Sequence, residues 1–316
     1  MRSEKLKTLS KVFFVLLFFN SCGSPQGCFP RFADLKTEYP HVIYHGPKEP
    51  SEIVLQKNPP PLWTPISQIS QKAQGAVIVS EDWAFYQHPG YDEKQIKEAV
   101  EQSVEAGKLK RGASTITQQV VRNIYLTKQK SMVRKVRELW LATKIEKVLG
   151  KKRILELYFN IAEWGEDTFG IGPAAKLYFN KSPSELTAKE GAFLAMLLPS
   201  PKKYATSFRS HELSPYARKI IRSILNKMVM AHFITPEERD REWATPLSFE
   251  TKFDPSVPSD ESLEELDAID NTDDDSDDAT TGTAPSANTE TQDGNKVPVE
   301  EKNTPDKPQE GLPSAQ

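Results

Sequence analysis

The sequence is poor in cysteine and lacks a phosphate-binding loop. Its 316 residues include two cysteines, Cys22 and Cys28, too few for a disulfide framework or a cysteine-ligated metal cluster. Both lie in a Pro- and Gly-bearing stretch ahead of the predicted folded region, so neither is a credible nucleophile. The glycine, lysine and hydroxyl spacing of phosphate-binding loops is absent, which argues against an enzyme that uses nucleoside triphosphates.

The apolar run of the N-terminal segment is too short to span a membrane. Its apolar run, Val12–Phe19, would extend about 12 Å as a helix, against roughly 30 Å of bilayer hydrocarbon. Basic residues precede this run, as is typical of a secretory signal peptide. The segment that ends at Cys22 resembles a relaxed lipobox, so we predict lipidation there. A disulfide with Cys28, two inert thiols or an uncleaved signal anchor are the alternatives.

Acidic residues gather at the C-terminal end, where aromatic residues are absent. Residues 254–316 contain 18 Asp/Glu and 3 Lys/Arg, a net charge of −15, so residues 1–253 carry +12 of the whole-chain −3. Such a segment cannot bury enough apolar surface to offset its ordering entropy, and we predict a disordered acidic tail. The predicted organisation is a signal peptide and lipidation site at 1–22, a linker at 23–61, a folded domain at 62–253 and the tail at 254–316.

Helical patterns dominate the predicted domain. Capping boxes at Ser182–Glu185 and Thr187–Glu190 predict helix starts, as do Ser214-Pro215 and Thr235-Pro236. The clearest strand candidate is Ala76–Val79. We therefore expect a mainly α fold with a small β element. Further helices are predicted at Tyr91–Ala106, Ser114–Tyr125, Ser131–Leu149 and Lys151–Trp164, with Gly150 as a C-cap.

One carboxylate, Glu81, follows an apolar run and precedes three aromatic residues. Partial desolvation there would raise its pKa towards the range of a general base. The alternative is an acid that caps backbone amides, a role for which Asp82 is the better candidate. His88 lies before Pro89-Gly90 and is predicted to be a structural histidine that bonds a loop.

A block of uncharged hydrogen-bonding residues opens a strongly basic stretch. Hydroxyls and amides over 114–119 could hold sugar hydroxyls and phosphate oxygens, or could simply start a helix. Residues 108–153 contain 14 Lys/Arg against Glu138 and Glu146, which predicts a polyanionic partner such as phospholipid or pyrophosphate. Aromatic residues are sparse, which argues against single-stranded nucleic acid. Glu138 is either an exposed ion pair with Arg134 or an acid beside a phosphate site.

Together these motifs resemble the monofunctional biosynthetic peptidoglycan glycosyltransferases, family 51 of the glycosyltransferases, whose domain also occurs in bifunctional penicillin-binding proteins. The resemblance covers roughly Trp63 to Arg241. It is carried by Glu81-Asp-x-x-Phe85-x-x-His88-x-Gly90, Gly112-Ala-Ser-Thr-Ile-Thr-Gln-Gln119, Arg134-Lys-Val-Arg-Glu138, Lys152-Arg-Ile-Leu-Glu-Leu-Tyr-Phe-Asn160, Gly170-Ile-Gly-Pro-Ala-Ala-Lys-Leu-Tyr-Phe179 and Leu194–Pro201.

The resemblance implies a two-lobed, lysozyme-like fold and an enzyme that polymerises lipid II at the outer face of the bacterial cytoplasmic membrane. Glu81 would be the general base. Glu138 would organise the donor site, with a divalent cation such as Mg²⁺ between it and the pyrophosphate and no organic cofactor. The residues implied to bind donor sugar and pyrophosphate are Ser114, Gln118, Gln119, Arg122, Asn123, Lys130, Arg134 and Arg137.

The chain departs from the family pattern at Arg122, where lysine is usual, and at Lys130, where arginine is frequent. Both keep the charge but change the geometry of a phosphate contact. The implied partners are lipid II, the nascent strand, the membrane surface and a separate transpeptidase, with no nucleic acid. A lysozyme-like hydrolase or a lytic transglycosylase would explain Glu81 but not the basic stretch, because cutting a glycan leaves no pyrophosphate. An anchored scaffold that only binds lipid II is the non-enzymatic alternative.

Overall fold

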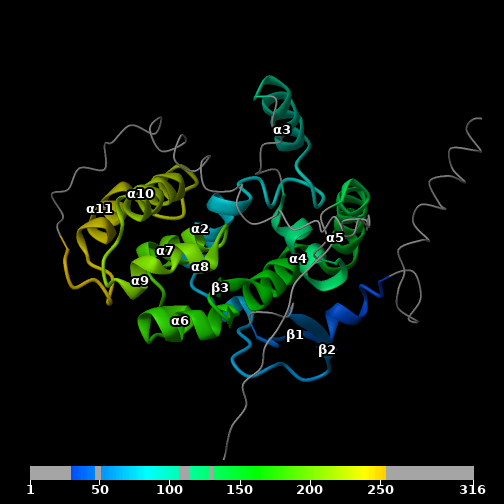
Figure 1. Ribbon diagram of the computed structural model, residues 1–316, viewed down its shortest axis with the longest axis horizontal. Helices are drawn as coiled ribbons and strands as arrows, with labels where there is room; N and C mark the ends of the chain where they lie inside the picture. Colours follow the sequence, from blue (N-terminus) through cyan, green and yellow to red (C-terminus); the bar gives the residue numbers. More distant parts are fainter. Residues whose placement is uncertain (1–29, 47–50, 107–113, 128–130, 254–316) are drawn as a thin grey trace, which may run out of the picture. The chain divides into compact units, whose positions relative to one another are not determined.

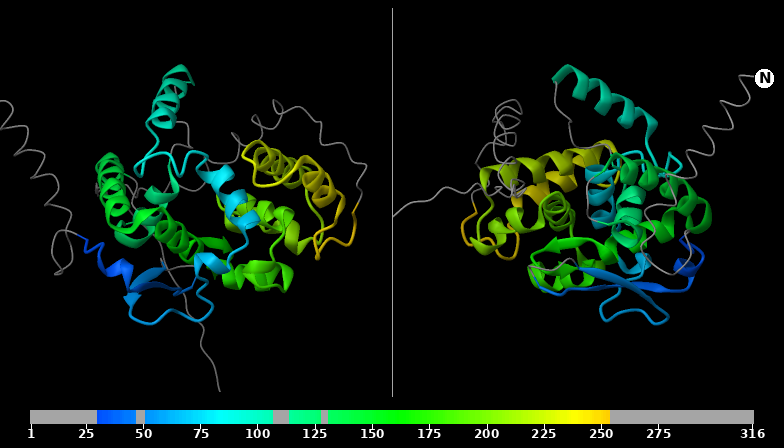
Figure 2. Two further views of the ribbon diagram at one scale, coloured as in Figure 1. Left: turned by 180° about the vertical axis from the view of Figure 1, so that it is seen from behind. Right: turned by 45° about the vertical axis from the view of Figure 1, so that its right-hand side comes forward.

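The computed structural model describes residues 30–46, 51–106, 114–127 and 131–253 (Figures 1 and 2). The predicted signal peptide with Cys22, the residue Lys130 and the acidic tail lie outside these ranges. The prediction of a mainly α fold is confirmed. The α-helices are α2 Gln71–Glu81, α3 Glu93–Ala106, α4 Ile116–Tyr125, α5 Met132–Ile161, α6 Ile171–Phe179, α7 Ala188–Leu197, α8 Pro201–Tyr204, α9 Thr206–Arg209, α10 Pro215–Met230 and α11 Pro236–Ala244.

Short 3-10 helices and two antiparallel strand pairs complete the described fold. Strand β1, Tyr39–Ile43, pairs with β2, Glu52–Gln56, with Tyr39 opposite Gln56. Strand β3, Glu163–Gly165, pairs with β4, Thr168–Phe169. The predicted small β element is therefore present, but it lies elsewhere than expected. The 3-10 helices are η1 Asp34–Lys36, η2 Ile66–Gln68 and η3 Pro183–Glu185.

The predicted strand at Ala76–Val79 is wrong, because these residues form the second half of helix α2. A short apolar run does not distinguish a strand from a helix that is buried on all sides. Burial decides here, since residues 76–79 are all buried. Helix α2 packs on α7 and α10, and small residues permit the approach: a Cβ on Gly191 would lie 2.7 Å from the Cα of Ala73.

The prediction of a linker is also wrong for the described part of residues 23–61. The β1–β2 pair belongs to the folded structure, and Leu35 in η1 is fully buried. Arg153 of α5 donates to the carbonyl oxygens of Leu35 and Glu38 and lies over the ring of Tyr39. Proline does not prevent this arrangement, because in a two-stranded sheet both strands are edges, where Pro40 is tolerated.

Local helix signals were more reliable than these two predictions. Both predicted capping boxes form, at Ser182 and at Thr187. The break predicted at Gly150 is confirmed: α5 consists of two helices joined across a kink, where Gly150 has a non-helical backbone with a positive φ of 73°. None of the helices in the described ranges combines the length and the apolar character that crossing a bilayer requires.

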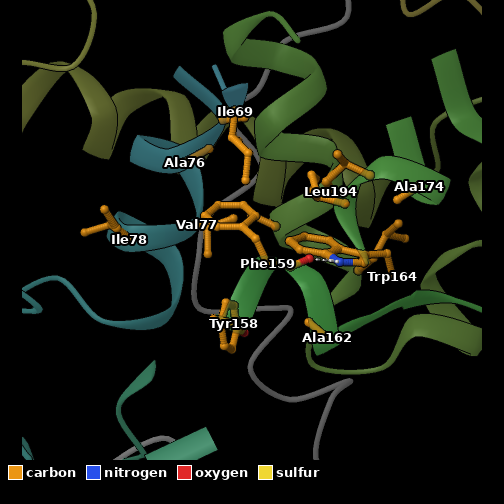
Figure 3. Packing of buried hydrophobic residues seen from close by; sticks show 14 of the residues in the cluster. Ile69, Ala76, Val77, Ile78, Tyr158, Phe159, Ala162, Trp164, Ala174 and Leu194 are labelled. Atoms are coloured by element: carbon orange, nitrogen blue, oxygen red, sulfur yellow. Dashed lines mark hydrogen bonds between the residues drawn. The ribbon is translucent and has the colours of Figure 1, made fainter. Parts of the chain in front are cut away.

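The apolar core links α5 to the α2–α7 pair. Figure 3 shows the rings of Phe159 and Trp164 stacked among residues from several helices, with the Trp164 Nε1 donating to the Phe159 carbonyl oxygen. Helix α4 packs separately along α5. Asp82 at the end of α2 bonds to the start of α4, and the candidate site lies between their polar ends.

Candidate active site

Glu81 is the last residue of α2 and is half-buried. Gln119 Nε2, from α4, donates to its Oε2 at 2.8 Å. Burial raises the pKa of Glu81, while the bond from Gln119 and the charge of Arg122 oppose that rise. The adjacent Asp82 adds to the rise. The predicted desolvation of this carboxylate is therefore present, and its hydrogen-bond partner is a neutral group.

Asp82 connects the end of α2 to the start of α4 through hydrogen bonds of its carboxylate. Its Oδ2 accepts from the backbone N–H of Ile116 at 3.0 Å, and its Oδ1 lies 2.8 Å from His88 Nε2. His88 Nδ1 accepts from the backbone N–H of Gly90, so Nε2 carries the proton that is donated to Asp82. Both residues match their predicted structural roles, although Asp82 caps α4 rather than its own helix.

Helix α4 begins with a capping box that uses a predicted substrate-binding residue. Thr115 Oγ1 accepts from the backbone N–H of Gln118, whose side-chain Oε1 accepts from the backbone N–H of Thr115. Gln118 is fully buried, and its Nε2 has no hydrogen-bond partner among the described residues. Its amide therefore turns inward in this structure, and its role in substrate binding stays a prediction.

Glu138 does not form an exposed ion pair, because its side chain is fully buried. Arg134 NH1 lies 2.9 Å from its Oε2, and Lys135 Nζ lies 2.6 Å from its Oε1. Lys135 Nζ also donates to Ser114 Oγ at 2.6 Å. The structure thus brings together Ser114, Arg134 and Glu138 as predicted, with Lys135 as the link between them.

The remaining predicted residues that the structure describes lie on the same two helices. On α4, Gln119 and Arg122 are half-buried and Asn123 is exposed. On α5, Arg137 is half-buried. Because α4 carries Gln119 towards Glu81 and Ser114 lies just before its first turn, this one helix connects both carboxylates.

Comparison with known proteins identifies the family. A family profile described as Transglycosylase matches residues 51–229, more than half of the chain. The chain belongs to the transglycosylase family. Residues 51–61, which the profile includes, were assigned to a linker from the sequence, so the match extends into the strand pair described above.

Several relatives share substantial identity. A protein named biosynthetic peptidoglycan transglycosylase from Paraburkholderia xenovorans (strain LB400) is 42% identical over 166 residues, which cover 52% of this chain and 68% of that protein. Its namesake from Nitrosospira multiformis is 38% identical, covering 54% of this chain and 72% of that protein. Penicillin-binding protein 1A of Neisseria cinerea is 41% identical over 60% of this chain but only 23% of its own length.

The geometry around Glu138 does not fit a divalent cation. Each carboxylate oxygen is already bonded to a cationic nitrogen, from Arg134 or from Lys135. Protein-bound Mg²⁺ takes oxygen ligands in octahedral geometry. The described residues also bring together no group of three or more His, Cys, Asp or Glu that could hold a metal ion. In this arrangement two side-chain cations occupy the place that the resemblance gave to a metal.

Sequence reasoning missed three residues that shape the site. Lys135 precedes Glu138 by three positions, the spacing of neighbours on one helix face, so that signal was available. Glu146 accepts from Thr117 Oγ1 and from Lys151 Nζ, both at 2.6 Å, and ties α4 to α5. Tyr158 donates to Gln119 across 39 positions of sequence, which no local pattern could reveal.

Proposed function

We propose that this family member polymerises lipid II into β-1,4-linked glycan strands, with Glu81 as the general base. The chain is a peptidoglycan glycosyltransferase of cell-wall synthesis, the class to which its family and its relatives belong. One observation carries the assignment of the base: Glu81 is a half-buried carboxylate whose pKa is raised by burial and whose bonded partner is the neutral amide of Gln119.

The raised pKa suits proton removal from a sugar hydroxyl. A base is most effective when its pKa lies near the working pH, and burial moves a carboxylate in that direction. Glu81 would take the proton of the acceptor 4-hydroxyl as its oxygen attacks the anomeric carbon of the donor. The bond from that carbon to the undecaprenyl pyrophosphate breaks, and the configuration inverts. The pyrophosphate leaves with the bonding electron pair.

The cationic cluster around Glu138 would receive that leaving group. Negative charge builds on the pyrophosphate in the transition state, and fixed donors lower its energy most when they need no rearrangement. Glu138 would hold Arg134 and Lys135 in place, since it contacts both. Proposed further contacts to the donor come from Ser114, Gln119, Arg122, Asn123, Lys130 and Arg137.

The proposed mechanism assigns no divalent cation to Glu138. Both oxygens of Glu138 are engaged by side-chain cations, so no step is assigned to a metal here. We propose that Arg134 and Lys135 supply the positive charge. Activity that persists in excess chelator would agree with this proposal, and loss that magnesium restores would refute it.

Attachment to the outer face of the cytoplasmic membrane is also proposed. The first turns of α5 expose Met132, Val133 and Val136, at 74%, 52% and 45%, beside Arg134 and Lys135. Apolar side chains flanked by basic ones suit an anionic bilayer surface. Lipidation of Cys22 would add an anchor, and Cys22→Ala should release the protein from the membrane fraction. A separate transpeptidase would cross-link the strands.

Incubating the full chain with labelled lipid II in detergent tests the polymerisation. The expected product is a ladder of polymer on a gel that lysozyme digests. Preformed glycan, added in a parallel reaction, should stay intact. Shortening of that glycan without a ladder would instead indicate a hydrolase, and no change in either substrate would indicate a binding protein.

A further inference from the structure

Tyr158 is a buried phenol with no part in the steps above. It belongs to α5, is 1% exposed, and its ring, labelled in Figure 3, lies edge-on to Phe159 with the ring centroids 6.4 Å apart. Its hydroxyl lies 3.3 Å from Gln119 Oε1. A buried phenolic hydroxyl normally finds a hydrogen-bond partner, and this one finds it on α4, next to the carboxylate.

The Gln119 side chain joins this phenol to Glu81. Its Nε2 donates to Glu81 Oε2 at 2.8 Å, while its Oε1 accepts from the Tyr158 hydroxyl. The ionised carboxylate only accepts, so it selects the donating end of the amide, and the Tyr158 hydroxyl, which donates here, holds the opposite end in place. If the amide were reversed, its oxygen would face the carboxylate, and two acceptors would oppose each other.

We propose that Tyr158 is a positioning residue for Glu81, because its hydroxyl holds the Gln119 amide in the orientation that donates to the carboxylate. This inference rests on the proposed role of Glu81 as the base. A hydrogen bond to the charged form of a carboxylate favours ionisation, so the amide keeps Glu81 able to accept a proton in a site where burial opposes its charge.

Within the described residues, two charged groups act on Glu81. Arg122 of α4 favours its ionised form, and Asp82, the next residue in the chain, opposes it. Tyr158 itself remains a donor, because burial and the nearby Glu81 raise its pKa well above the ordinary value. The orientation of one neutral amide can therefore change the pKa of Glu81 measurably.

The substitution Tyr158→Phe removes the hydroxyl and keeps the ring. We expect the acid limb of the kcat/KM profile against pH to move up by about half to one pH unit, the size of one hydrogen bond. Tyr178→Phe is the matched control, since Tyr178 is 3% exposed and donates to the Trp164 carbonyl oxygen at 2.9 Å. If the acid limb does not move in Tyr158→Phe, or moves equally in Tyr178→Phe, the inference is wrong.

A second variant tests the inference in case Tyr158→Phe folds poorly. Gln119→Leu should move the acid limb in the same direction, and adding Tyr158→Phe to it should move the limb no further, because both act through one amide. If the acid limb does not move in Gln119→Leu, or if the shifts of the two substitutions add, the proposed positioning of Glu81 through Gln119 is wrong. If Glu81→Gln keeps its activity, the proposed base is wrong. If Glu81→Gln is inactive but the pH profile of Tyr158→Phe does not move, only the inference about Tyr158 is wrong.

Discussion

The two carboxylates of the site lie in opposite surroundings. Glu81 is bonded by a neutral amide, and burial raises its pKa. Glu138 is fully buried, yet two cationic side chains bond it. In the proposed mechanism one takes up a proton and the other holds cations, although the residue type is the same. Neighbours rather than the residue assign the role, a pattern shared by other paired-carboxylate sites.

The largest expected effect is a loss of activity, without a loss of stability, when Glu81 is substituted. Glu81→Gln should lower glycan synthesis by about 10²–10⁴-fold, because the proton acceptor is lost. Stability should change little, since the substitution keeps the shape and removes a desolvated charge. Lipid II turnover and urea unfolding measure the two quantities. A variant that polymerises normally, or one that unfolds, would break the contrast with Glu138.

Glu138→Gln should show the opposite balance. Without the carboxylate, Arg134 and Lys135 face each other with their charges uncompensated. We expect a loss of about 1–3 kcal/mol in the free energy of unfolding, below the full value for a buried pair because Lys135 is 41% exposed. Donor binding should weaken as well.

Glu101→Gln on α3 is the control for that loss, because Glu101 is 60% exposed and pairs with Lys97 at 3.9 Å. An exposed helix pair of this kind contributes little, so urea unfolding should detect almost no change. Equal losses in the two variants would mean that burial of Glu138 does not matter.

A smaller effect is expected from Arg122, whose charge lowers the pKa of Glu81. Arg122→Gln should raise the acid limb of kcat/KM by up to about one pH unit, because the ionised base loses a favourable charge. Arg137→Gln is a suitable comparison on α5. A limb that moves equally in both would indicate a general effect of charge rather than one local to Glu81.

The smallest effect concerns the dependence of stability on pH. Burial raises the pKa of Glu81 above its unfolded value, so the folded state binds this proton more tightly than the unfolded chain. The resulting stability is fully present below the unfolded pKa and is lost as pH rises through the folded pKa. Unfolding of wild type and Glu81→Gln from pH 4 to 8 should therefore diverge with wild type favoured at the acid end. Parallel curves would contradict the burial.

Local signals in the chain anticipated much of the fold. Thr115, Ser131 and Thr187 cap helices where hydroxyl residues precede them, because a cap needs only the next three residues. Gly150 takes the positive φ that favours glycine. The motif order identified the family, and the basic stretch placed positive charge on α4 and α5.

Longer-range contacts decided the rest. Ala76–Val79 became helical because α7 and α10 surround it, and propensity alone does not report such neighbours. Gln118 turned inward while Gln119 faced Glu81, a choice made by the start of α4 and by a carboxylate 38 positions away. Burial and hydrogen bonds between residues far apart in the chain set proton affinity, so the division of roles between Glu81 and Glu138 exists only once the helices pack.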